Sequence, residues 1–143
     1  MIVVDDHLLL DALAGTISTQ LQVVLASNDV ATTLSWYYRL ARAIGSVRTD
    51  GSLTRCFTDL TESKRAEIRR VLGQLPLSIA IVEARTAVPV MVGVTGATRS
   101  KLLTAEAVTT GPVLDADIAV GVESSLLREA AEIAHVVAHY VGQ

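Results

Sequence analysis

Two acidic residues, far apart in the chain, stand where parallel strands are expected to end, and a third lies on a neighbouring predicted helix. Asp5 follows the apolar run Ile2–Val4, and Glu123 follows the apolar run 118–122. Glu106 lies on a predicted helix that leads into the second run. Because the carboxyl ends of parallel strands meet at one edge of a sheet, these side chains are expected to converge there. Carboxylates held together repel one another unless a cation neutralises them. The pattern therefore predicts phosphodiester hydrolysis assisted by Mg²⁺ or Mn²⁺, with these three acids as the catalytic residues.

The stretch around Asp5 supports two interpretations. Val3 and Val4 are β-branched and suit a buried strand, whereas the leucine-rich stretch 8–13 favours a helix. An Asp at such a junction caps the helix that follows it. The same carboxylate is a ligand for a hard cation, and Asp6 beside it would then contribute as well. In the second interpretation the metal ligands are Asp5, Asp6, Glu106 and Glu123.

The composition and the order of the predicted elements indicate an α/β fold. Half of the 143 residues are hydrophobic and only 3% are aromatic, so Val, Leu, Ala and Ile must fill the interior, as they do in parallel sheets. Strands are predicted at 2–4, 21–26, 77–82, 118–122 and 136–141, and helices at 8–13, 33–44, 62–72, 101–109 and 126–134. A loop with room for a short helical turn is predicted at 45–59, an irregular segment at 88–94, and a break at Gly111-Pro112. This alternation predicts one domain, 1–143, a three-layer sandwich around a mostly parallel central sheet.

Basic residues concentrate in the middle of the chain. Residues 39–70 hold eight of the twelve basic residues and four acids, so this segment carries +4 and the remainder −7. A basic segment beside a carboxylate site steers a polyanion toward it. Under that interpretation RNA contacts Arg39, Arg42, Arg65 and Arg69. The alternative is an ordinary solvated helix surface.

Several classes of protein are excluded by what the sequence lacks. No apolar run reaches the roughly 18–20 residues needed to cross a bilayer. Asp5 and Asp6 stand where a signal peptide would be basic or apolar, so we expect a soluble, cytoplasmic protein without a membrane partner. The single cysteine, Cys56, rules out an internal disulfide and a cysteine-based zinc cluster.

Two stretches resemble PIN-domain proteins, a family of small α/β nucleases that includes the toxins of many bacterial toxin–antitoxin pairs. Ile2-Val3-Val4-Asp5 followed by a leucine-rich helix is similar to the opening of that family. The stretch from Glu106 to Gly111, continued by 119–127, is similar to its third-acid helix, glycine turn, strand and fourth acid. The resemblance implies a metal-dependent ribonuclease with Asp5, Glu106 and Glu123 as ligands. It also implies a small antitoxin partner and a homodimer.

The chain departs from the family pattern at its acidic positions. The family carries a second acid early in the helix after its second strand, and the stretch 32–38 contains none. Asp6 or Asp29 would have to replace it. The family also favours Asp where this chain has Glu106 and Glu123, and a hydroxyl where it has Gly121. These departures define an alternative function, a PIN-like binding module without nuclease activity.

Overall fold

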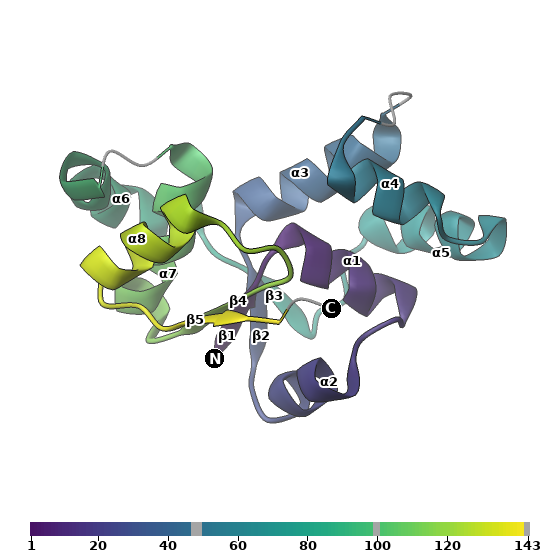
Figure 1. Ribbon diagram of the computed structural model, residues 1–143, viewed down its shortest axis with the longest axis horizontal. Helices are drawn as coiled ribbons and strands as arrows, with labels where there is room; N and C mark the ends of the chain where they lie inside the picture. Colours follow the sequence, from purple (N-terminus) through teal and green to yellow (C-terminus); the bar gives the residue numbers. More distant parts are fainter. Residues whose placement is uncertain (47–49, 99–100, 142–143) are drawn as a thin grey trace.

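A parallel sheet of five short strands lies between two groups of helices (Figure 1). The computed structural model describes residues 1–46, 50–98 and 101–141. The strands follow the order β3-β2-β1-β4-β5, and each neighbouring pair is parallel. Their bounds are β1 Ile2–Val4, β2 Val30–Thr32, β3 Ile79–Ile81, β4 Asp117–Val120 and β5 Ala138–Tyr140. The predicted α/β sandwich with a parallel central sheet is confirmed.

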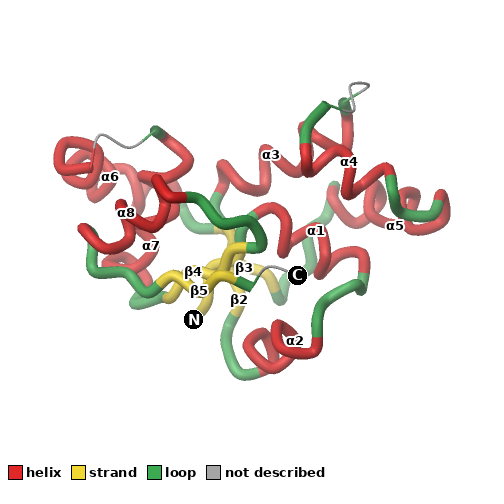
Figure 2. Tube along the Cα trace, viewed as in Figure 1, coloured by secondary structure: helices red, strands yellow, loops and turns green. Residues whose placement is uncertain are grey.

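Helices cover both faces of the sheet, which gives three layers (Figure 2). One layer consists of α1 Asp6–Ala14, α2 Thr19–Ala26, α3 Leu34–Gly45, α4 Ser52–Thr58 and α5 Glu62–Leu72. The other consists of α6 Ala84–Thr98, α7 Leu102–Leu114 and α8 Ser125–Ile133. Successive residues of a strand point to opposite faces. Accordingly Val3 packs in the core under α6–α8, while Ile2 and Val4 pack in the core under α1–α5.

Local capping signals place several helices where the sequence predicted them. Asp5 is the N-cap of α1 and Gly15 ends that helix in the left-handed conformation, with φ of 70°. Thr61 and Ser124 cap α5 and α8 through their hydroxyl oxygens. Each of these side chains accepts a backbone N–H that the first turn of a helix cannot otherwise satisfy. Because these capping contacts join residues close together in the sequence, they fix the helix ends locally.

Other element predictions were wrong. Residues 21–26 lie in α2, capped by Ser18, and the second strand is at 30–32. In α2 only Leu21 is buried, while Val23 is 63% exposed, so the apolar run is not a core strand. The segment predicted as irregular at 88–94 lies within α6. By contrast, the short helical turn that the prediction allowed within the loop at 45–59 is present as α4.

The predicted break at Gly111-Pro112 was also wrong, because both residues lie within α7. A Cβ on Gly111 would come within 2.3 Å of the Val136 side chain, so the glycine allows α7 to approach the segment that leads into β5. The glycine therefore serves close packing rather than a turn.

None of the described helices is by itself long and apolar enough to cross a membrane. Helices α1 and α2 reach that length and composition only as a pair, with a bend of 97° between them.

Candidate functional site at the carboxyl edge of the sheet

A pocket of about 210 Å³ opens where β1 and β4 end, and we call it the edge pocket. Its polar lining comes from both ends of the chain and from the middle: Asp5, Asp6, His7, Arg39, Ser52, Thr104, Glu123 and Ser124. Trp36, Leu103 and Leu127 contribute apolar surface. Of the predicted acids, the structure thus brings Asp5, Asp6 and Glu123 to one pocket. Glu106 is not among the residues that line it.

Asp5 is buried and holds the start of α1 against the end of β4. Its Oδ1 accepts a hydrogen bond from Leu8 N at 2.9 Å, and its Oδ2 accepts one from Gly121 N at 3.0 Å. Burial raises the pKa of Asp5 to about 6, although the Leu8 hydrogen bond opposes that shift. The capping interpretation of Asp5 is confirmed. Both of its oxygens already have a protein donor.

Asp6 is also buried and lies between two basic side chains. Its Oδ1 accepts a hydrogen bond from His7 Nδ1 at 3.1 Å. Its Oδ2 lies 2.9 Å from Arg39 Nε. That ion pair is not aligned as a hydrogen bond, so among the described residues Oδ2 is a buried acceptor without a hydrogen-bond donor. The guanidinium of Arg39, itself about half exposed, provides the positive charge that a buried carboxylate needs.

His7 joins the acidic pair and contacts a residue of α4. Its Nε2 lies 3.3 Å from Ser52 Oγ, and the hydrogen bond with Asp6 raises the pKa of His7 above its ordinary value, against the effect of burial. Ligand atoms of Asp5, Asp6 and His7 all lie within 4.8 Å of one another. Sequence reasoning missed His7, although its place directly after two aspartates was a usable signal.

Glu106 is buried beside the pocket and binds the start of α3. Its Oε1 accepts from Leu34 N at 3.2 Å, and its Oε2 accepts from Ser35 N at 2.9 Å. These N–H groups belong to the first turn of α3, where they have no partner within the helix. A carboxylate is also favoured there by the helix dipole. In this structure Glu106 therefore acts as a cap supplied by another helix.

Glu123 lines the edge pocket from its exposed rim. Its side chain is 59% exposed and forms an ion pair with Arg128 of α8. Such an exposed pair contributes little to stability and can open at small cost. Among the predicted acids, Glu123 is therefore the one most easily turned toward a ligand.

The four arginines predicted to bind RNA fall into two pairs. Arg39 and Arg42 of α3 line a groove that adjoins the edge pocket and shares Arg39 and Ser52 with it. Arg65 and Arg69 lie on α5, where both form ion pairs with Glu62, and Arg69 also stacks 5.3 Å from the centre of the Phe57 ring. The first pair is at the site, where Arg39 also forms the ion pair with Asp6, whereas the second pair shares the single carboxylate of Glu62 outside the groove.

Some features of the edge pocket favour the binding of a divalent cation, and others oppose it. The unsatisfied Asp6 Oδ2 and the closeness of Asp5, Asp6 and His7 favour one. The Arg39 guanidinium, 2.9 Å from Asp6, opposes a bound cation because it is itself positively charged. The imidazole of His7 is a better ligand for Mn²⁺ than for Mg²⁺, which prefers oxygen ligands. With Glu106 bound to α3, the set Asp5, Glu106 and Glu123 does not fit Mg²⁺ as arranged.

Comparisons with protein-family models, with curated proteins and with solved structures find no match. The resemblance to PIN-domain proteins therefore depends on the sequence motifs alone.

Proposed function

We propose that this chain is a PIN-like RNA-binding module whose acidic site is neutralised by its own arginine and does not cleave RNA. The observation that carries the proposal is the position of Arg39 Nε, 2.9 Å from the buried Asp6 carboxylate. A guanidinium supplies there the charge that a catalytic cation would otherwise supply. The absence of an acid early in α3 agrees with this interpretation, since α3 presents Arg39 to the pocket.

The groove beside the edge pocket supports contact with a phosphate backbone. Arg42 and Arg39 lie one turn apart on α3 and line this groove, and guanidinium groups bind phosphate oxygens through paired hydrogen bonds. RNA laid along the groove would reach the edge pocket at Ser52. Such binding depends on salt, because each phosphate contact releases a counterion.

A PIN-like, Mg²⁺- or Mn²⁺-dependent endoribonuclease is the second candidate. It is favoured by the presence of Asp5, Asp6, His7 and Glu123 on one pocket and by the unsatisfied Asp6 Oδ2. In that case Asp5, Asp6 and Glu123 would hold the ion, after Arg39 moved away. The ion would supply activation of water and stabilisation of the leaving oxygen.

Metal titration and an RNA assay distinguish the two candidates. We expect fluorescence anisotropy to report RNA binding that is equal in EDTA and in Mn²⁺, with intact RNA on a gel. Calorimetry with Mn²⁺ should show no saturable heat. RNA cleavage that stops in EDTA and in Asp5→Asn would instead establish the second candidate.

One arginine tests the groove itself. Arg42→Ala should weaken RNA binding and lower the slope of log K against log salt by about 0.7, the value for one lost contact to a single strand. Arg85→Ala, an exposed arginine on α6 in the other layer, is the matched control and should leave both unchanged. Equal effects of the two substitutions would show binding by overall charge rather than by this groove.

The proposal also includes three expectations from the sequence: a cytoplasmic location, a homodimer and a small antitoxin partner. Size-exclusion chromatography with light scattering tests the homodimer directly.

A further inference from the structure

Three side chains of the edge pocket form a continuous hydrogen-bonded series. Asp6 Oδ1 lies 3.1 Å from His7 Nδ1, and His7 Nε2 lies 3.3 Å from Ser52 Oγ. Asp6 and His7 begin α1, and Ser52 is the first residue of α4, which packs against α1. All three line the same pocket, so a ligand there is within reach of the serine hydroxyl.

The order of the series gives each group a definite role. An ionised carboxylate only accepts hydrogen bonds, so Nδ1 of His7 carries the proton that Asp6 accepts. The opposite nitrogen, Nε2, then has a free lone pair directed at Ser52 Oγ. Asp6 is 2% exposed and is held from its other side by Arg39, so it fixes the orientation of the imidazole. A serine beside a base that a carboxylate orients is the arrangement that activates a hydroxyl nucleophile.

We propose that Ser52, His7 and Asp6 form a nucleophile, base and carboxylate set that hydrolyses small carboxylic esters in the edge pocket. Ser52 Oγ attacks the ester carbonyl carbon while its proton passes to His7 Nε2. The alcohol leaves with that proton, and an acyl group remains on Ser52. Water then attacks the acyl carbon, its proton passes to His7, and the carboxylic acid leaves as Ser52 recovers its proton. Ester and water are consumed, and alcohol and acid are formed.

The rest of the pocket defines the substrate. Trp36, Leu103 and Leu127 offer an apolar wall to the acyl group, and a volume of about 210 Å³ admits only a short one. Arg39 lines the same pocket, and a guanidinium is suited to stabilise the negative charge that develops on the carbonyl oxygen. This activity depends neither on RNA binding nor on the absence of a metal reaction, so it can fail or succeed independently of the proposed function.

A fluorophosphonate probe tests the nucleophile, since it forms a bond from phosphorus to an activated serine oxygen and releases fluoride. We expect one adduct by intact-protein mass spectrometry, mapped to Ser52, and hydrolysis of p-nitrophenyl acetate. Ser52→Ala should lose both, and because Ser52 is exposed this variant should melt like the wild type. Ser63→Ala, an exposed serine on α5 outside the pocket, is the matched control and should label normally.

The base needs a readout that a structural role would not change. His7→Ala should label at least about 10²-fold more slowly, the usual effect of losing a general base, and added imidazole should restore part of the rate. A folded wild-type protein without an adduct, an adduct that persists in Ser52→Ala, or labelling unchanged in His7→Ala would overturn the proposal.

Discussion

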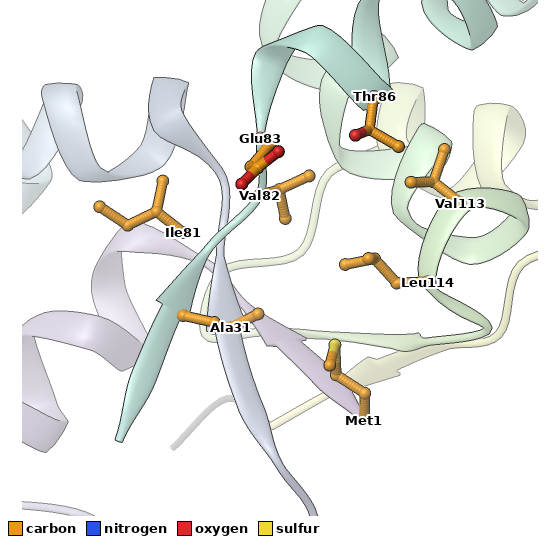
Figure 3. A pocket seen from close by; sticks show the side chains of 9 residues that line it. Met1, Ala31, Ile81, Val82, Glu83, Thr86, Val113 and Leu114 are labelled. Atoms are coloured by element: carbon orange, nitrogen blue, oxygen red, sulfur yellow. The ribbon is translucent and has the colours of Figure 1, made fainter. Parts of the chain in front are cut away.

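Two cavities of similar size lie on this sheet, and they differ in chemistry. The edge pocket, of about 210 Å³, gathers two aspartates, a glutamate, a histidine, an arginine and three hydroxyl side chains. The other, of about 180 Å³, lies against β2 and β3 beneath α6 and α7 (Figure 3). We call it the apolar cavity, because Met1, Ile81, Val82 and Leu114 dominate its lining and Glu83 is its one acid.

The difference in lining between the two cavities follows from where each lies on the sheet, not from its volume. The edge pocket forms where β1 and β4 end and where α1 and α8 begin, so backbone N–H groups are available to hold carboxylates there. The apolar cavity lies between a strand face and two helices, where side chains that point off the sheet must be apolar. Removal of a polar group is therefore expected to lower the free energy of unfolding strongly in the edge pocket and only slightly in the apolar cavity.

The largest effect is expected from Asp5→Ala. It removes the N-cap of α1 and leaves Leu8 N and Gly121 N without an acceptor in a buried place. Together these should lower the free energy of unfolding by about 2–4 kcal/mol. Chemical denaturation measures it. Asp29→Ala, at an exposed aspartate, should stay within about 0.5 kcal/mol, and equal losses would contradict the special role of Asp5.

The raised pKa of Asp5 should make the stability of the protein depend on pH. The pKa of Asp5 is about 6 in the folded protein and near 3.8 without its surroundings, so the folded state binds more protons between these values. Its contribution to stability is then full below about pH 4 and is lost as the pH rises toward 6. We expect the wild type to lose about 2 kcal/mol relative to Asp5→Asn over this range. A constant difference between the two proteins would contradict the raised pKa.

A single substitution, Arg39→Glu, should convert the edge pocket into a metal site. Arg39→Glu places a third carboxylate against Asp5 and Asp6 and removes the competing guanidinium. At a Mn²⁺ concentration ten times the Kd, binding should stabilise this variant by about 1.4 kcal/mol, while the wild type should not respond. Arg42→Glu, one turn further along α3, is the control. Thermal denaturation with and without Mn²⁺ measures all three.

The smallest effect is expected in the apolar cavity. Thr86 is exposed at its rim, and its hydroxyl forms no hydrogen bond with residues 1–46, 50–98 and 101–141. Thr86→Val should therefore change the free energy of unfolding by less than about 0.5 kcal/mol. A loss as large as that of Asp5→Ala would show that the two cavities are less different than their linings indicate.

Much of the fold was predictable because its signals are local. The β-branched Val3 and Val4 before Asp5 indicated a buried strand, and the helices predicted at 62–72 and 126–134 correspond to α5 and α8. The prediction of a strand at 21–26 depended on Val23 and Val24, which suit a strand, whereas the Ser18 cap starts α2 just before them. A run this short does not distinguish a strand from a helix by its apolar content.

The site was less predictable because it depends on contacts between distant residues. Arg39 is 33 positions from Asp6, and Ser52 is 45 positions from His7. Only the packing of α3 and α4 on α1 brings them together. Glu106 illustrates the same limit. Its place on a helix was predicted, but its binding to Leu34 N and Ser35 N depends on the position of α3.

The Glu106 contact also has a consequence for how the molecule opens. The Glu106 side chain extends from the α6–α8 layer and accepts hydrogen bonds from the first turn of α3 in the opposite layer. It therefore links the two helical layers at the edge of the sheet. Separating the layers at this point would break both hydrogen bonds of Glu106 at once. The two layers should therefore exchange their amide protons as one cooperative unit.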